Sequence, residues 1–250
     1  MKIEYHKNFS PILSQDMEFK VYGHAGKPIL VFPAQGGRFF EFEDFGMIAT
    51  VNERIEAGEI QIITPDSLDN QTWANWNAHP AERAARHEAY DQYICKELIP
   101  FLRERLGIKA KAFTTGVSMG GYHCTNFFFR HPDIFDGVIA LSGIMQLKMF
   151  IGDYSDDLVY FNSPLSYLPN LSDPWYLERY RKSQIVICVG QGAWEEPMLF
   201  DARQLKEILA EKQIPAWIDF WGYDVNHDWP WWRKQFPYFL SKMDLSSHED

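Results

Sequence analysis

The residues Gly116-Val117-Ser118-Met119-Gly120-Gly121 follow the pattern Gly-x-Ser-x-Gly, in which a serine stands between two positions without side chains. Such a serine lies on a strained turn between a strand and a helix, where side chains at the two glycine positions would collide with backbone. The N-terminus of the following helix then favours a developing oxyanion beside the hydroxyl. Short patterns of this kind also arise by chance in unrelated chains. Here an apolar run at 112–115 precedes the pattern and an apolar helical pattern at 122–129 follows it, which is the strand–turn–helix context that the motif requires. We therefore predict that Ser118 is a nucleophile.

A serine hydroxyl needs a hydrogen-bonded base, which is usually histidine. Where this motif occurs, the order along the chain is nucleophile, acid and base, with the base after the last strand. Of the eight histidines, only His227 and His248 follow the last expected strand, and His248 belongs to a polar tail. His123 lies five residues beyond Ser118 on the same helix and is expected to point away from it. The sequence therefore favours His227 as the base.

The acid is expected after the apolar run at 185–189, where the chain reads Gly190-Gln191-Gly192-Ala193-Trp194-Glu195-Glu196-Pro197. Glu195 has the better spacing from Gly192, whereas Glu196 stands next to Pro197 and suits the first turn of a helix. We predict Glu195 as the acid, with Glu196, Asp201 and Asp224 as alternatives. Asp228, beside the base, is expected to cap the helix that starts at 229–230.

Short apolar runs alternate with helical patterns along the chain, which predicts a mostly parallel sheet with helices on both faces. A single domain over residues 1–250 is expected. The run at 19–22 alternates, as in an edge or antiparallel strand, and residues 144–180 form an aromatic-rich insertion. Helical spacing is expected at 81–106, kinked or divided at Pro100, and at 200–212. The expected buried strands are 29–32, 60–64, 112–115, 137–141, 185–189 and 217–221.

Composition excludes several classes of protein. The chain has 250 residues, of which 46% are hydrophobic and 23% charged, so it can bury a core and intrinsic disorder is not expected. A net charge of −10 argues against nucleic acid and anionic membranes as partners, and no apolar segment is long enough for a membrane span. Three widely spaced cysteines predict buried thiols rather than disulfides or a zinc site, and without a signal-peptide pattern a cytoplasmic location is expected.

Several further segments resemble one family. The segments are 97–101 before the nucleophile strand, 116–121, 131–136 leading to Ala140-Leu141-Ser142-Gly143, the Gln191-Gly192-x-x-Glu195 loop and the late His227. Together they resemble the putative-esterase (esterase D-like) branch of the α/β-hydrolases, which includes S-formylglutathione hydrolases, feruloyl and acetyl-xylan esterases and mycolyltransferases. The resemblance implies an α/β-hydrolase fold and a cofactor-independent serine carboxylesterase with Ser118, Glu195 and His227 as its triad.

Two positions depart from the family pattern. Aspartate is usual where this chain has Glu195. Because glutamate is longer by one methylene, the backbone of the acid loop must lie further from the histidine. The first oxyanion loop, at 33–38, lacks the His-Gly pair that is common in α/β-hydrolases. Because backbone N–H groups form this hole, the resemblance still implies that Met119 and either Gln35 or Gly36 donate to the oxyanion.

The substrate is not determined by these motifs. Trp73, Trp76 and Trp229, together with Trp231 and Trp232, are expected either to wall a pocket for small acyl or aromatic esters or to close the core beneath it. The polar loop at 66–77 does not match an EF-hand, so no metal is expected. Two rival functions are an acyltransferase with the same triad and a non-catalytic protein that binds sugars or aromatics. A homo-oligomer is compatible with the sequence, which contains no motif that fixes the oligomeric state.

Overall fold

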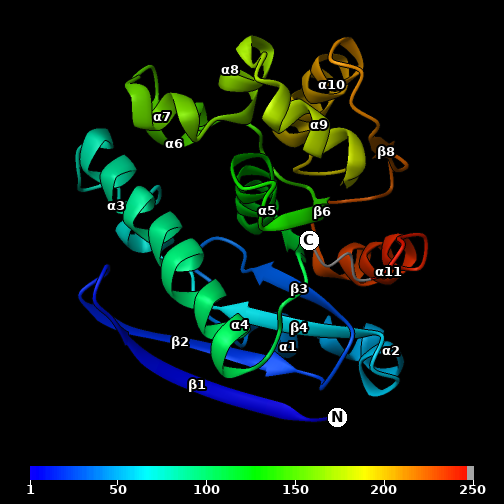
Figure 1. Cartoon of the computed structure of the whole chain (residues 1–250). Helices are drawn as coiled ribbons and strands as arrows, with labels where there is room; N and C mark the ends of the chain where they lie inside the picture. The colour runs from blue at the N-terminus through cyan, green and yellow to red at the C-terminus, as the bar shows by residue number, and fades with distance from the viewer. Residues whose placement is uncertain (247–250) are drawn as a thin grey trace.

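The computed structural model describes residues 1–246, and its centre is one eight-stranded sheet. The strand order is β1-β2-β4-β3-β5-β6-β7-β8, and Figure 1 shows the first four of these strands side by side. β1 and β2 pair antiparallel, β2 pairs antiparallel with β4, and all remaining neighbours are parallel. The strands are β1 (Ile3–Ser10), β2 (Gln15–Tyr22), β3 (Lys27–Phe32), β4 (Ile60–Pro65), β5 (Ala112–Val117), β6 (Phe135–Leu141), β7 (Gln184–Val189) and β8 (Trp217–Phe220). The predicted α/β fold with a mostly parallel sheet is confirmed.

Helices cover both faces of the sheet because alternate residues of the central strands point in opposite directions. In β3, Leu30 and Phe32 join one apolar cluster, whereas Ile29 and Val31 join the other. The first cluster includes residues of α3, α4, α5 and α10, and the second includes residues of α2 and α11. The helices outside 144–180 are α1 (Glu41–Asp44), η1 (Ile48–Val51), α2 (Asn52–Glu56), η2 (Asp69–Gln71), α3 (Pro80–Tyr93), η3 (Ile94–Leu98), α4 (Ile99–Arg105), α5 (Met119–Arg130), α10 (Glu196–Glu211) and α11 (Trp229–Leu240).

The long helical pattern at 81–106 is interrupted before Pro100 rather than at it. α3 runs into a π-helical turn, η3, and α4 begins at Ile99, so that Pro100 lies in the first turn of α4. Leu98 keeps helical backbone angles, so α4 continues η3 directly, and the π-helical turn stands where a proline without an N–H interrupts the regular bonding of the helix. The three segments still form one continuous rod that crosses the sheet (Figure 1).

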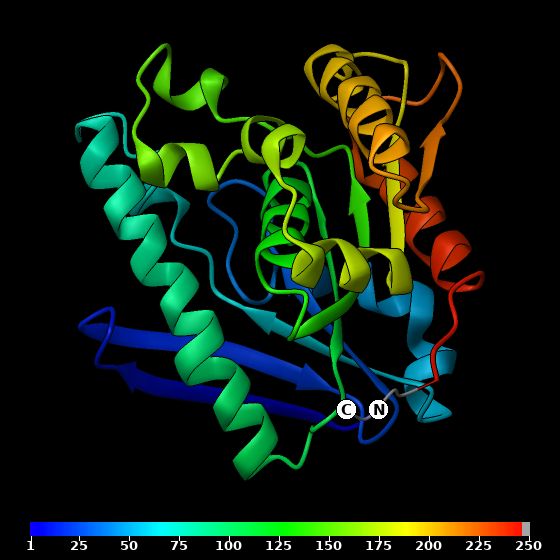
Figure 2. The ribbon, with the colours of Figure 1, turned by 45° about the horizontal axis from the view of Figure 1, so that its top comes forward.

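The aromatic-rich insertion folds into short helices beside α5 (Figures 1 and 2). Its elements are α6 (Lys148–Ile151), α7 (Asp157–Phe161), α8 (Pro164–Tyr167), η4 (Leu168–Asn170) and α9 (Pro174–Lys182). The edge strand β1 was not expected from the sequence. Ile3, Tyr5 and Phe9 alternate with polar residues along it, but their side chains are exposed, and the strand is paired with β2 alone.

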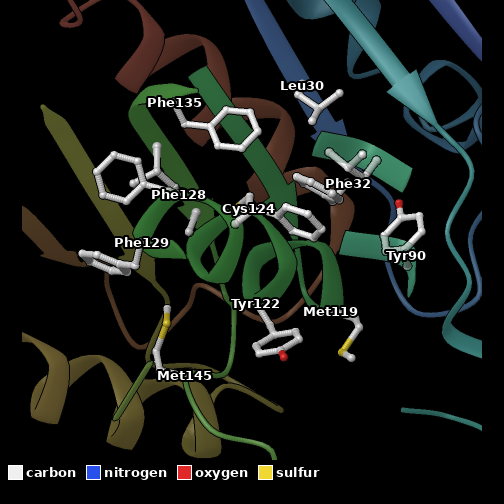
Figure 3. Packing of buried hydrophobic residues seen from close by; sticks show 14 of the residues in the cluster. Leu30, Phe32, Tyr90, Met119, Tyr122, Cys124, Phe128, Phe129, Phe135 and Met145 are labelled. Carbon is white, nitrogen blue, oxygen red and sulfur yellow. The ribbon is translucent and has the colours of Figure 1, made fainter. Parts of the chain in front are cut away.

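α5, the helix that follows Ser118, is buried on all sides. Every residue from Met119 to Phe129 is buried, and Figure 3 shows Cys124, Phe128 and Tyr122 pointing to different parts of the core around it. A helix that is surrounded by core holds its first residue rigidly in place. The thiols of Cys124 and Cys188 are buried as expected, but Cys95 is only partly buried. Within residues 1–246, no helix is both long and apolar enough to cross a membrane.

Candidate active site

Ser118 occupies the sharp turn between β5 and α5 that the motif predicts. Its backbone has φ 56° and ψ −121°, a left-handed conformation that is costly for a residue with a side chain. A Cβ at position 116 would overlap the backbone of Gly120, and one at 120 would overlap the carbonyl of Phe32. The glycines therefore allow α5 to approach the strand ends closely enough to hold this turn.

A continuous chain of hydrogen bonds connects the predicted acid, base and nucleophile. His227 Nε2 lies 2.9 Å from Ser118 Oγ, and His227 Nδ1 lies 3.3 Å from Glu195 Oε2. The Glu195 side chain is 1% exposed and that of His227 is 18% exposed. The structure thus brings together all three residues that were expected to form the triad. His248 lies outside the described residues.

The loops that carry the acid and the base are bonded to each other. His227 N–H donates to the carbonyl of Ala193 at 3.0 Å, and Ala193 N–H donates to Asn226 Oδ1 at 2.8 Å. Gly192 permits this contact, because a Cβ there would meet Asn226 Oδ1 and the carbonyl of Val225. Two hydrogen bonds therefore join loops that are far apart in sequence.

Adjacent residues of the acid loop point in opposite directions. Trp194 has a positive φ of 68° and is 84% exposed, whereas Glu195 is buried. Glu196 is exposed and begins α10, which is the helix-starting role that its place beside Pro197 suggested.

Neither aspartate candidate for the acid reaches the base. Asp201 accepts from Met145 N–H at 2.8 Å, and Asp224 has no bond to His227 in the described structure. Asp228, the direct neighbour of His227, caps α11 by accepting Trp229 N–H at 2.7 Å, as expected. Glu195 is therefore the one carboxylate bonded to His227 among residues 1–246.

Ser142 holds the acid from behind, a role that the sequence did not suggest. It follows β6, has a φ of 53° and is fully buried. Its hydroxyl donates to Glu195 Oε1 at 2.6 Å and accepts from the indole N–H of Trp232 at 3.1 Å. The ring of Trp232 also packs edge-on against His227, with centroids 4.9 Å apart. In the sequence, only the position of Ser142 at the carboxyl end of an expected parallel strand indicated that it lies near the site.

Two backbone N–H groups beside Ser118 have no acceptor among residues 1–246. They belong to Met119, at the start of α5, and Gln35, in the loop after β3. Both residues line the same cavity as Ser118. The N–H of Gly36, which was the second candidate in this loop, is occupied, because it donates to Asp69 Oδ2 at 3.1 Å. The geometry therefore favours Gln35 over Gly36 as the partner of Met119.

The cavity at Ser118 has a volume of about 410 Å³ and a largely apolar wall. Ile144, Phe150 and Met198 line it together with the exposed side chains of Met149 and Trp194. Glu196 contributes a carboxylate, and no basic side chain other than His227 is among the lining residues that the structure describes. This size is within the range of small-molecule sites.

The expected tryptophan wall does not form. Trp73 is fully buried against His87, which is the core-closing role that the sequence left open. Trp229 stacks on Phe45 with centroids 4.2 Å apart. Trp76 is exposed and stacks on Phe150, so it reaches the cavity only through that ring. Trp194, rather than Trp73, Trp76 or Trp229, is therefore the tryptophan among the lining residues of the cavity at Ser118.

One group of side chains has the composition of a metal site. Ligand atoms of Asp91, Cys95 and His131 lie within 4.8 Å of one another. However, Arg130 already lies 3.1 Å from Asp91 Oδ2, the oxygen that also faces His131 at 2.8 Å. Burial raises the pKa of the Cys95 thiol, which disfavours the thiolate that a metal requires. The group is better described as a structural ion pair.

Comparison with known proteins identifies a family and a fold for the chain. The profile of the family described as "Putative esterase" matches residues 10–243. A ferulic acid esterase superposes with a TM-score of 0.74 at 18% identity, covering 96% of each chain. An S-formylglutathione hydrolase from Staphylococcus aureus gives 0.70 at 16%, again over 96% of each chain, and Mycobacterium tuberculosis MPT51 gives 0.73 at 13% over 97% of each chain. No curated protein matches the chain significantly.

The solved structures are too distant in sequence to show more than the fold, but the family profile covers most of the chain. The resemblance that the motifs indicated is confirmed. The chain belongs to the putative esterase family and is a serine hydrolase of the α/β-hydrolase fold.

Proposed function

We propose that this protein is a serine carboxylesterase that hydrolyses small, uncharged acyl or aromatic esters through Ser118, His227 and Glu195. The observation that carries this proposal is the hydrogen-bonded chain from Glu195 through His227 to Ser118, which ends in a cavity of about 410 Å³. A serine of this kind becomes a nucleophile because a histidine removes its proton as it attacks.

In the acylation step, Ser118 Oγ attacks the carbonyl carbon of the ester while its proton passes to His227 Nε2. The N–H groups of Met119 and Gln35 donate to the oxyanion of the tetrahedral intermediate. Glu195 accepts from His227 Nδ1–H and stabilises the imidazolium. When the intermediate collapses, the bond to the alkoxy oxygen breaks, and His227 returns the proton to the departing alcohol.

Deacylation repeats these steps with water as the nucleophile. His227 removes a proton from the water as it attacks the acyl carbon, and a second tetrahedral intermediate forms in the same hole. Its collapse breaks the bond to Ser118 Oγ, which takes the proton back and releases the carboxylic acid. An alcohol that replaced water would give a new ester instead, so the same residues would serve an acyltransferase.

The lining of the cavity supports the substrate class. Met149, Phe150 and Met198 offer apolar contacts to an acyl or aryl group. The carboxylate of Glu196 faces the same space, and the net charge of the chain is −10, so an anionic ester would be repelled.

The test is hydrolysis of p-nitrophenyl acetate by the purified wild type and by Ser118→Ala. We expect release of p-nitrophenol by the wild type and loss of at least ~10³-fold in kcat/KM in the variant. Equal rates in the two proteins would contradict the proposal. Product analysis with added alcohol separates a hydrolase, which forms acetate, from an acyltransferase, which forms the new ester.

A further inference from the structure

The loop that presents Gln35 is a tight turn whose shape depends on one glycine. Gly37 N–H donates to the carbonyl of Ala34 at 2.8 Å, which closes a four-residue turn with Gly36 in third place. Gly36 has a φ of 70°, the sign that a type II turn requires at this position. Gly36 N–H belongs to the central peptide of this turn, so a hydrogen bond to it anchors the turn that carries the neighbouring Gln35 N–H.

A buried aspartate and histidine hold that turn. Asp69 Oδ2 accepts Gly36 N–H at 3.1 Å, and Asp69 Oδ1 lies 2.7 Å from His123 Nε2. The two side chains are 1% and 2% exposed. Buried carboxylates with both oxygens bonded are stiff, since every alternative rotamer would leave a polar atom unpaired.

His123 belongs to α5, the helix that begins directly after Ser118. Its bond to Asp69 therefore ties the turn that carries one oxyanion donor to the helix that carries the other. Glu41 supports the same loop by accepting Ala34 N–H at 2.7 Å. With Ala34 and Gly36 both bonded, Gln35 N–H is the one donor of these three that has no acceptor in the described structure.

We propose that Asp69 and His123 are positioning residues that set the oxyanion hole of this esterase by fixing the Gly36 peptide relative to α5. The proposal rests on the function proposed above. Neither side chain is among the lining residues of the cavity, so both act through the backbone of residues 35 and 36.

The chain contains a matched control. Asp91 on α3 lies 2.8 Å from His131 Nε2 just beyond the other end of α5, and its side chain is 4% exposed. This second pair also joins a buried aspartate to a histidine, although His131 is 21% exposed and Asp91 also pairs with Arg130, and no bond from it reaches the loop at 34–37 in the described structure. Asp91→Ala thus reports the general cost of losing a buried aspartate beside α5.

The experiment compares Asp69→Ala, Asp69→Asn and Asp91→Ala on p-nitrophenyl acetate. We expect Asp69→Ala to lower kcat by ~10–100-fold with KM little changed, because a misplaced donor weakens transition-state binding. Asp69→Asn keeps an oxygen for Gly36 N–H and an amide for His123 Nε2, so its kcat should stay within about fivefold of the wild type. Asp91→Ala should keep its kcat even if its melting temperature falls.

A second readout needs no turnover. Phenylboronic acid forms a tetrahedral adduct with a reactive serine, and one of its oxygens occupies the oxyanion hole. Its affinity should fall in Asp69→Ala in parallel with kcat and stay near the wild-type value in Asp91→Ala. Should Asp69→Ala fail to fold, His123→Leu and His123→Gln replace it, because glutamine can still donate to Asp69 and leucine cannot. The expected order of kcat and boronate affinity is then Gln above Leu.

The proposal is overturned if Asp69→Ala keeps both kcat and boronate affinity, if asparagine is no better than alanine, or if Asp91→Ala loses as much activity. A wild type that hydrolyses no ester would refute the proposed function instead. In that case the boronate affinities of the same variants would still decide whether Asp69 sets the hole.

Discussion

On one side of Ser118, the loops after β7 and β8 present the side chains of Glu195 and His227; on the other, the loop after β3 and the start of α5 present backbone N–H groups. The acid–base side needs particular residue types, because only an imidazole and a carboxylate can carry out its proton transfers. The oxyanion side needs particular backbone directions, which many residue types can supply.

The two sides are nevertheless supported in the same way. A buried hydroxyl, that of Ser142, fixes the carboxylate of Glu195, and a buried carboxylate, that of Asp69, fixes the peptide of Gly36. Ser118 and His227 are thus partly exposed and the two proposed oxyanion donors lack acceptors among residues 1–246, while Glu195, Ser142 and Asp69 are buried and bonded. In both halves of the site, a buried side chain that does not itself face Ser118 fixes the position of a group that does, through one hydrogen bond.

Removal of the base should have the largest effect on the acid–base side. We expect His227→Ala to lower kcat by roughly 10³-fold or more, since Ser118 would lose its only bonded base in the described structure. The matched change His131→Ala removes a histidine that is bonded to Asp91 and should leave turnover near normal. Steady-state kinetics on p-nitrophenyl acetate checks both, and near-normal turnover in His227→Ala would refute the assignment.

The acid provides the next largest effect and a comparison between neighbours. Glu195→Gln should lower kcat by roughly 10²–10⁴-fold, because a neutral amide stabilises neither the tautomer nor the imidazolium. Glu196→Gln keeps the triad, and it removes the acidic charge in the first turn of α10, worth about 0.3–1 kcal/mol. Its kcat should therefore fall far less. If the two variants exchange roles in side-by-side assays, the assignment of the acid is wrong.

Loss of the Ser142 hydroxyl, which bonds the acid, should lower kcat by a smaller factor than loss of the acid itself. Ser142→Ala removes the hydroxyl that bonds Glu195 and leaves the indole of Trp232 without its acceptor. We expect kcat to fall about tenfold, which corresponds to roughly 1.4 kcal/mol of lost positioning. Ser10→Ala is the control, since Ser10 is about as buried and its hydroxyl accepts the local Leu13 N–H. An unchanged kcat in Ser142→Ala would show that the hydrogen bond from Ser142 is not needed to position the carboxylate of Glu195.

The smallest effect concerns stability beneath the oxyanion side, where the ring of His87 stacks on that of His123. Burial lowers the pKa of His87 well below its usual value, and the nearby His123 lowers it further. The unfolded chain thus binds more protons, so the contribution of a neutral His87 is complete above about pH 6.5 and is lost as the pH falls below it, by at most ~1.4 kcal/mol per pH unit.

His87→Phe should therefore weaken the acid dependence of the free energy of unfolding. Urea midpoints of the wild type and the variant at pH 7.5 and pH 5.5 measure this difference. The neighbouring ionisable groups His123, Asp69, Tyr90 and Tyr122 remain in both proteins, so they do not account for a change between them. Equal losses of stability in the two proteins would exclude His87 as the source.

The residues proposed to react could be picked out from the sequence because their types are rare at those places in the chain. A serine between glycines after an apolar run, and a histidine after the last strand, each had few competitors. Trp73 and Trp229 were harder to place, since a tryptophan suits a core as well as a cavity wall and only packing separates the two. Ser142 and Asp69 gave little signal, because short polar residues at strand ends usually belong to turns.

By itself, the amino-acid sequence determined the alternation of buried strands and helices, the strained turn at Ser118 and the order of acid and base. These properties depend on local spacing, on apolar periodicity and on the missing side chains of Gly116 and Gly120. Only the tertiary structure decided that Glu195 faces inward while Glu196 faces the cavity, and that Gln35 N–H is free while Gly36 N–H is bonded. Both choices depend on contacts between segments more than 30 residues apart, because the partner of a polar group is decided only when those segments pack against each other.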